Sequence, residues 1–468
     1  MSVDLKLYSG YVVFRNETYA FAFSDDELHL IPPEERKDAC IDTFFLNSLR
    51  SNEDAVNEDY IEGECYETNS RIVFLPVKNS LVDSINSSLI IKIFAYILFN
   101  HRPAEFSRIA FSCPEINHIH PITQAIRHES IMEDDVVFSV RTMPNEKTCT
   151  ERQLFHIDGH DVYAYFGMIQ TASAKVDRPP LSITASLYFD FEPTLDYGFA
   201  YRLWQTAYHF IRFLCYRNNI SLPVATLHSL YKDDLYPKCA ELRVVANKEE
   251  TETYPLETDR CIKQAFIAGS EGKILSDIAQ NTICLRHIPE TYKAGKHFNE
   301  ARYVLITAAF EWEFQRLYPD GITKSDESRA AEAAVTKALT QLKEEAGGKQ
   351  RKIYKRLLKL VESSSIASDI VQVGEDFPFM AELFGNRMYE LNGAVLDYAE
   401  MGKRLSSQRN HFAHADMDKP FDEDSIMDLA YVEWIVYAVQ LRYYEVSDRN
   451  IQQAINSLFH LNRLMLGE

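Results

Sequence analysis

Several short motifs that mark common enzyme classes are missing from the sequence. It contains no G-x-x-x-x-G-K-[ST] phosphate loop, no G-x-S-x-G elbow and no H-E-x-x-H pair. No motif therefore supports an NTPase, a serine hydrolase or a zinc protease. All eight cysteines precede residue 285, and no two form a C-x-x-C pair. This argues against a zinc ribbon and is typical of reduced thiols in a cytosol. We therefore expect no bound metal and no cofactor.

Long apolar runs are also missing. The most apolar segment, Leu89 to Phe99, is interrupted by Lys92 and is too short to span a bilayer, so we expect a buried helix near residues 80–100. The first residues, MSVDLKLYSG, lack the basic-then-apolar order of a signal peptide. A content of 46% hydrophobic and 12% aromatic residues indicates a well-packed globular protein. We expect a cytoplasmic protein without membrane contact.

Positive charge is scarce for a protein that would bind nucleic acid. The chain carries 49 Lys and Arg against 69 Asp and Glu, a net charge of −20, whereas affinity for phosphate backbones comes largely from Lys and Arg. Residues 291–468 account for only −5 of this charge and residues 1–290 for −15. A local basic patch is enough for an enzyme that engages RNA briefly, although a basic helix face is often just solvated surface. The candidate RNA-binding residues are Lys352, Lys355, Arg356, Lys359, Lys403 and Arg404.

The first part of the chain has the short alternating runs that are typical of β-strands. Asp158-Gly159 lies between two of these runs and predicts a hairpin turn, and residues 197–216 form an amphipathic helical pattern, while residues 220–290 are mixed. The sequence therefore predicts a β-rich region over residues 1–290, either as one domain or as two subdomains, 1–195 and 196–290. The predicted strands are Tyr11–Phe14, Tyr19–Phe23, Arg71–Val77, Val136–Val140, His160–Gln170 and Leu181–Phe191.

From about residue 292 the pattern becomes helical. Apolar residues from Tyr303 to Leu317 recur at spacings of three and four, and Pro319-Asp320-Gly321 stops this helix. Five or six helices are expected over residues 291–468, which would form a compact bundle. The predicted fold class is therefore α+β, with a β-rich N-terminal region followed by an all-α bundle. The further expected helices run from Ser325 to Gly347-Gly348, over 350–362, from about Phe379 with a bend at Asn392-Gly393, over 422–445 and over 448–465.

The hexapeptide Arg409-Asn410-His411-Phe412-Ala413-His414 is the chain's single R-x4-H pair. A histidine can transfer a proton near neutral pH. An arginine carries a permanent charge on a planar group, which suits the phosphate in the transition state of cleavage. Asn410 would orient the phosphate. Five steps along a straight helix place Arg409 and His414 about 140° apart, so either the helix is distorted or two copies of the chain contribute to one site.

With Phe298-Asn299-Glu300-Ala301-Arg302-Tyr303 opening the first long helix and R-N-x-x-x-H late in the bundle, residues 290–468 resemble a HEPN domain. The closest likeness is to the ApeA-like HEPN group of bacterial anti-phage proteins. The resemblance implies a metal-independent endoribonuclease that acts on RNA, such as tRNA, in abortive infection and is toxic to its own cell. It also implies a homodimer whose two HEPN domains share the site. Because an unrestrained ribonuclease would injure its own host, we expect residues 1–290, which carry no catalytic signature, to hold it in check until a trigger such as a phage protein binds.

Other interpretations of the same residues remain open. The bundle can be a non-catalytic HEPN-type module that dimerises or binds a partner, in an antitoxin-like role, and His414 can be an ordinary residue at a helix end. Glu311 and Glu313 are candidates to support the site by orienting an arginine, although carboxylates on a helix surface usually do not. His118 with His120, and His156 with His160, have the spacing of metal pairs but lack a convergent Cys or acidic cluster.

Overall fold

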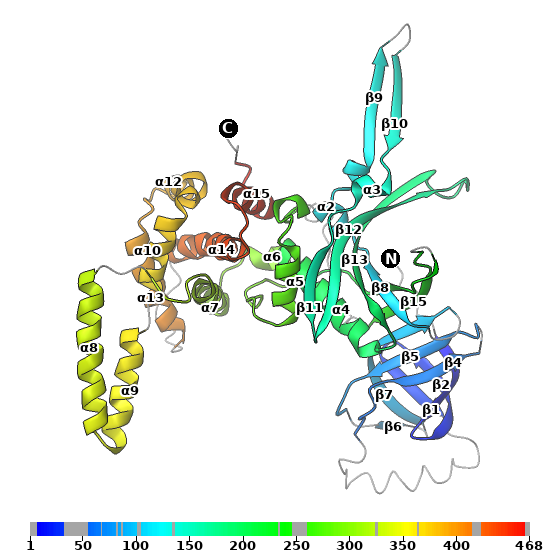
Figure 1. Ribbon diagram of the computed structural model, residues 1–468, viewed down its shortest axis with the longest axis horizontal. Coiled ribbons are helices and arrows are strands. Elements are labelled where there is room, and N and C mark those ends of the chain that lie inside the picture. The colour runs from blue at the N-terminus through cyan, green and yellow to red at the C-terminus, as the bar shows by residue number, and fades with distance from the viewer. Residues whose placement is uncertain are drawn as a thin grey trace. The chain divides into compact units, whose positions relative to one another are not determined.

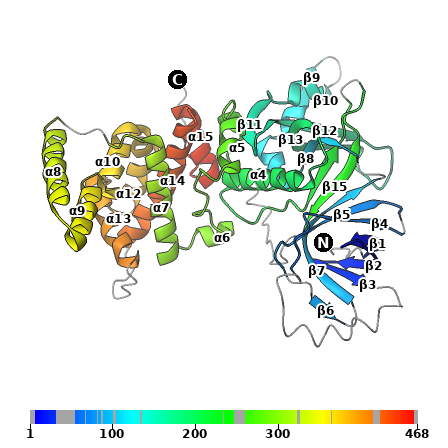
Figure 2. The same ribbon diagram turned by 60° about the horizontal axis from the view of Figure 1, so that its bottom comes forward.

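The computed structural model divides the chain into two compact units (Figures 1 and 2). The sheet unit comprises Met1–Leu214, Asn219–Asp259 and Glu271–Gln280, and the helical unit comprises Cys215–Asn218, Arg260–Ser270 and Asn281–Glu468. The chain is α+β in the predicted order, β-rich first and then all-helical. The structure describes residues 7–31, 55–66, 68–80, 83–85, 88–100, 104–132, 136–232, 235–245, 260–322, 326–362, 365–413 and 423–463.

One sheet dominates the sheet unit, with the strand order β11-β12-β13-β8-β14-β15-β7-β3-β2-β1-β4-β5. Because β5 also pairs with β7, the six strands from β7 to β5 close into a ring around an apolar core that includes Phe21, Phe74 and Ile91. The strands are β1 Tyr8–Phe14, β2 Glu17–Ser24, β3 Glu27–Ile31, β4 Ile61–Cys65, β5 Arg71–Pro76, β6 Asp83–Ile85, β7 Ser88–Phe99, β8 Phe106–Phe111, β11 Gln153–Ile157, β12 His160–Ala172, β13 Leu181–Thr194, β14 Val224–His228 and β15 Lys238–Val244.

Helices cover one side of the open part of this sheet. Helix α4 (Tyr197–Cys215) buries Phe210 against Phe166 of β12, with ring centroids 6.4 Å apart, and α5 (Glu271–Ala279) packs on β11. A separate hairpin is formed by β9 (Ile126–Met132) and β10 (Val136–Thr142). The residues between β8 and β9 form the short helices α2 (Pro114–Ile119) and η4 (Ile122–Ala125), and α3 (Asn145–Thr148) follows β10.

The six predicted strands and the α4 helix are confirmed. The hairpin is confirmed too: Ile157 pairs with His160, and Asp158 and Gly159 have φ values of 51° and 81°, as a tight two-residue turn requires. The expected helix near 80–100 is wrong, because Ser88–Phe99 is strand β7. From Ile91 onward every second side chain of β7 is buried, a period of two that the high apolar content of the segment concealed.

The helical unit is centred on α7 (Glu300–Leu317), which packs along α14 (Glu423–Tyr443), while α10 packs along α13. The apolar stripe of α7 is confirmed, with Tyr303, Ile306 and Phe310 fully buried. The other elements are η7 Gln264–Phe266, α6 Tyr292–Gly295, α8 Asp326–Glu345, α9 Gly348–Glu362, α10 Ile366–Asp376, α11 Pro378–Met380, the π-helical turn η8 Ala381–Gly385, α12 Asn386–Leu391, α13 Tyr398–Ala413 and α15 Asp448–Phe459.

Two expectations for this unit need correction. The helix expected to bend at Asn392-Gly393 is in fact two, because α12 ends at Leu391 and α13 begins at Tyr398; Gly393 adopts a left-handed φ of 72° that ends a helix. The described residues also contain α10, which was not expected. Its N-cap Ser365 exchanges hydrogen bonds with Ser368 in a capping box, a signal hidden in the serine-rich stretch before it.

Helices α8 and α9 form an antiparallel hairpin that projects from the other helices of its unit in both views (Figures 1 and 2). No residue of α8 is buried, and on α9 Ile353 and Leu357 are largely exposed. Within the part of the chain that the structure describes, no helix has both the length and the apolar character needed to cross a membrane.

Candidate functional site

Arg409 and Glu311 meet where α13 runs beside α7. The Nη2 atom of Arg409 donates a hydrogen bond of 2.6 Å to Oε2 of Glu311, and the two side chains are 35% and 26% exposed. Burial raises the pKa of the Glu311 carboxyl, and the charge of Arg409 opposes that rise. The pair therefore holds a guanidinium at the surface in a defined orientation, with part of it still open to solvent.

The rest of the hexapeptide lies on the last turn of α13. Asn410 is exposed and follows Arg409 directly. Phe412 packs edge-on against Tyr303 of α7, with the ring centroids 5.3 Å apart. Gln408 is buried on the side that faces the bundle. Helix α13 runs as one α-helix as far as Ala413, and His414 lies outside the described residues. The structure thus brings together Arg409, Asn410 and Glu311, and it gives no position for the histidine.

Two of the predicted RNA-binding residues near the motif are engaged in ion pairs. Arg404 donates two hydrogen bonds, of 2.7 and 2.8 Å, to the fully buried carboxylate of Asp428, which also accepts one of 2.6 Å from the Tyr389 hydroxyl. These bonds raise the pKa of Arg404, so its guanidinium serves to join α13 to α14. Lys403 is exposed and lies 2.6 Å from Glu400, one turn earlier on the same helix. Its charge is thereby partly offset.

The predicted basic residues of α9 are placed differently. Lys352, Lys355 and Arg356 are exposed, and none has an ion pair with another described residue. The side chain of Lys359 lies outside the description. Positive charge that is not offset by a neighbouring carboxylate is therefore concentrated on the projecting hairpin rather than around Arg409.

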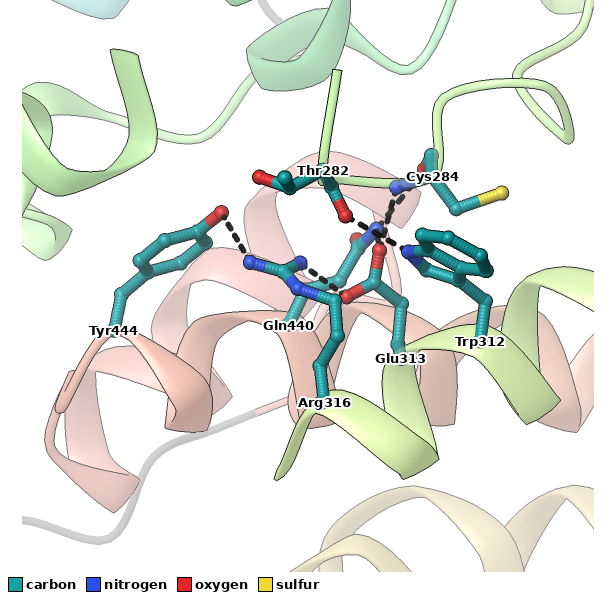
Figure 3. Close-up of polar contacts among 7 residues, drawn as sticks. All are labelled: Thr282, Cys284, Trp312, Glu313, Arg316, Gln440 and Tyr444. Carbon is teal, nitrogen blue, oxygen red and sulfur yellow. Dashed lines mark hydrogen bonds and ion pairs between the residues drawn. The ribbon is translucent and has the colours of Figure 1, made fainter. Parts of the chain in front are cut away.

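Glu313, two residues after Glu311, points toward Cys284, Gln440 and Arg316 (Figure 3). Its buried carboxylate accepts hydrogen bonds from the Cys284 backbone N–H at 2.6 Å, from Gln440 Nε2 at 3.2 Å and from Arg316 Nη1 at 2.5 Å. Burial raises the pKa of this carboxyl, and the three donors oppose the rise. Beside it, Trp312 donates to the Thr282 carbonyl at 2.8 Å. Glu313 therefore ties the segment that precedes α6 to α7 and α14.

A second buried ion pair lies at the start of α7, and sequence reasoning missed it. Arg302, in the first turn of α7, donates to Glu433 of α14, and the hydroxyl of Tyr216 donates to the same carboxylate. His287 packs against Tyr216 at 5.8 Å and is almost fully buried. The signal available in the sequence was an acid within the long apolar run of α14, since a charge in such a position needs a buried partner.

In each of the two histidine pairs with metal-like spacing, one ring is engaged with another group. The ring of His120 is bonded to the Thr148 carbonyl at 2.7 Å, and that of His156 to Asp161 at 2.8 Å. Among the described residues no three His, Cys, Asp or Glu side chains converge as a metal site would need. What the described residues offer at the hexapeptide is a half-exposed guanidinium beside an exposed amide, a combination that can hold a phosphate.

Comparisons with known proteins do not add to this description. No protein-family model matches the sequence, and neither a search of curated proteins nor a search of solved structures finds a match.

Proposed function

We propose that the chain is a metal-independent endoribonuclease of the HEPN type, with its site at the C-terminal end of α13. The observation that supports this most directly is the contact of Arg409 with Glu311, which orients a partly exposed guanidinium next to Asn410. His414, five residues after Arg409 in the sequence, supplies the group that transfers a proton near neutral pH. The three residue types together match the needs of RNA cleavage without a metal.

In this mechanism His414 takes the proton of a ribose 2′-hydroxyl, and the 2′-oxygen attacks the adjacent phosphorus. Arg409 stabilises the negative charge that develops on the phosphate oxygens, and Asn410 orients them. A protonated His414 from a second copy, or a water molecule, protonates the leaving 5′-oxygen. The products are a 2′,3′-cyclic phosphate and a 5′-hydroxyl, and DNA is not cut because it lacks the 2′-hydroxyl.

The proposed active form is a homodimer in which two copies of α13 contribute to one groove. Residues five positions apart, as Arg409 and His414 are, would lie about 140° apart on an ideal straight helix. This favours a site shared by two copies, because an isologous contact would bring both residues from each copy to a common axis. The exposed cations Lys352, Lys355 and Arg356 of α9 would attract the RNA substrate, which can be a tRNA, through its phosphates.

We assign a regulatory role to the sheet unit in the same proposal. An unrestrained ribonuclease would injure its own host, and residues 1–290, which carry −15 of the net charge, are expected to restrain cleavage until a partner such as a phage protein binds. Death of the host cell through loss of its RNA would then be an abortive-infection response. An acidic surface repels RNA when it lies near, an effect that salt screens over about 10 Å at 0.1 M.

Incubation of the purified full chain with total RNA tests the nuclease directly. Without a trigger we expect only slow basal cleavage, because residues 1–290 restrain the site. This basal cleavage should be unchanged by EDTA, should leave 2′,3′-cyclic phosphate ends, and should fall about 10²–10⁴-fold in rate for both Arg409→Ala and His414→Ala. Arg387→Ala, which removes an exposed arginine elsewhere in the helical unit, is the control and should cut normally. Cleavage that survives His414→Ala, or that needs a divalent metal, would contradict the mechanism.

A non-catalytic binding module is the second candidate, and one observation favours it. Arg404 and Arg409 are each bonded to a carboxylate of a neighbouring helix, as structural arginines are. If this interpretation is right, the Arg409→Ala chain should lose stability or partner binding, and neither it nor the unaltered chain should cut RNA under any condition that includes the trigger.

A further inference from the structure

A hollow of about 300 Å³ lies on the outer surface of the six-stranded ring in the sheet unit. It is lined by side chains of β1, β4 and β5 and of the residue that precedes β4. The lining residues are Tyr11, Val13, Tyr60, Glu62, Gly63 and Arg71.

Aromatic rings are exposed around this hollow in an unusual concentration. Tyr60 and Tyr11 are 48% and 38% exposed, and Tyr66, which packs near the Tyr11 ring at 6.3 Å, is 59% exposed. Tyr60 is held edge-on against Tyr197 at 5.1 Å, so its ring has a fixed orientation. Exposed tyrosines are enriched at protein interfaces, since they bury a large area with little loss of conformational freedom.

The charges of the hollow favour a cation. Arg71 lies 3.3 Å from Glu64, and Tyr11 donates a hydrogen bond of 2.5 Å to the same carboxylate, so the positive charge of Arg71 is offset within the wall. Glu62 is exposed, and among the described residues its carboxylate accepts a long hydrogen bond of 3.4 Å from the Tyr197 hydroxyl. One acidic charge is therefore left over, in a region of the chain that is strongly acidic as a whole.

We propose that this hollow binds a lysine or arginine side chain of a partner protein. The cation would lie against the face of Tyr60 and close to the Glu62 carboxylate, while Tyr11 and Tyr66 cover the aliphatic part of the side chain. Cation–π contact at an exposed site contributes about 0.5–1 kcal/mol, or roughly a 2–5-fold change in affinity. A phosphate or other anion is disfavoured, because the only cation of the wall is paired with Glu64.

This proposal rests on the regulatory role of the sheet unit: the regulating partner would present a lysine or arginine side chain. Its test involves no RNA cleavage. The probe is a fluorescein-labelled hexa-arginine peptide, and its binding to the full chain is measured by anisotropy at 0.15 M salt. Tyr60→Ala and Glu62→Gln should each weaken binding about 2–5-fold, and Tyr60→Phe should bind like the unaltered chain. A chain that does not cleave RNA could still bind the peptide through Tyr60 and Glu62, and a chain that does not bind the peptide could still cleave RNA. The two proposals therefore fail separately.

Matched controls distinguish binding at the hollow from nonspecific attraction of the basic peptide to an acidic chain. Tyr163→Ala removes a tyrosine of the same unit that is 43% exposed, and Glu151→Gln removes one exposed negative charge away from the hollow; both should leave the affinity unchanged. Thermal melts check that each variant is folded. Equal effects of Tyr60→Ala and Tyr163→Ala would overturn the proposal, and so would a loss with Tyr60→Phe as large as that with Tyr60→Ala, or a labelled RNA oligonucleotide that binds in a Tyr60-dependent way.

Discussion

Arg409 of α13 donates a 2.6 Å hydrogen bond to Glu311 of α7, although the two residues are 98 positions apart in the sequence. The carboxylate holds the guanidinium from the side of the bundle, and among the described residues the other N–H groups have no partner, so a ligand can accept from them. Glu311 would thus act as a positioning residue for the arginine that the proposed mechanism needs, without touching the substrate itself.

Glu311→Gln tests this positioning role. The amide keeps the size of the side chain but loses the charge, so we expect kcat for RNA cleavage to fall about 10-fold with little change in KM, because the arginine acts mainly in the transition state. Stability should change by less than about 1 kcal/mol, since both partners are partly exposed. Steady-state cleavage of a labelled RNA and a thermal melt supply the two readouts. A large stability loss with unchanged kcat would make the pair structural.

A composite site predicts complementation between inactive chains. Arg409→Ala and His414→Ala chains, mixed after mild dissociation, should regain part of the cleavage rate, because the shared groove of the heterodimer keeps one Arg409 and one His414. Each variant alone provides the baseline, and a mixture of two Arg409→Ala preparations is the matched control. Full activity of a chain that sediments as a monomer would rule out the shared groove.

The sequence was a good guide where local chemistry decides the structure. The left-handed turn at Asp158-Gly159 and the apolar stripe that starts at Tyr303 follow from residue preferences and periodicity alone. The β7 strand was missed because its apolar content suggested a buried helix. Only its long-range pairing with β3, β5 and β15 makes the segment a strand, and single-sequence periodicity carries no record of such pairing.

The candidate site was predictable only in part, for a related reason. The spacing of Arg409 and His414 is visible in the sequence, and so is the presence of acids on α7. The sequence does not reveal that Glu311 faces Arg409 while Glu313 faces Cys284, since this depends on how α7 is rotated against α13 and α14. Likewise, the partner of Arg404 is a buried aspartate on a helix that starts 19 residues later.

The boundary of the helical unit leads to a prediction about truncation. Its contacts include Cys284 N–H to Glu313 and Ser457 to the Cys261 carbonyl, so a fragment that starts at residue 291 would lose both and leave the Glu313 carboxylate short of a donor. Both fragments lack Tyr216, which donates to Glu433 in the same unit, so the comparison concerns their difference: a 291–468 fragment should be less stable than a 260–468 fragment by several kcal/mol. Urea unfolding monitored by tryptophan fluorescence compares them, and equal midpoints would contradict the assignment of these segments.

His287 gives the helical unit a pH-dependent stability whose sign can be worked out. Burial lowers the pKa of this imidazole to about 3, and the charge of Arg302 adds to the effect. The folded protein therefore keeps His287 neutral, whereas an unfolded chain protonates it below a pH of about 6.5. Stability from this group is fully present above pH 6.5 and falls by about 1.4 kcal/mol per pH unit as the pH drops toward 3.

His287→Leu isolates this contribution. Neither ring nitrogen has a hydrogen-bond partner among the described residues, so an apolar side chain of similar size should cost little or even stabilise the protein at pH 8. Urea unfolding of both chains from pH 8 to pH 5 gives the comparison. The other titrating groups are common to both proteins, so they cancel in the comparison. Between pH 6.5 and pH 5, the free energy of unfolding of the variant should therefore rise by about 2 kcal/mol relative to that of the unaltered chain. A difference that stays constant over that range would mean that His287 is protonated in the folded protein or reaches solvent, and the buried neutral imidazole would have to be abandoned.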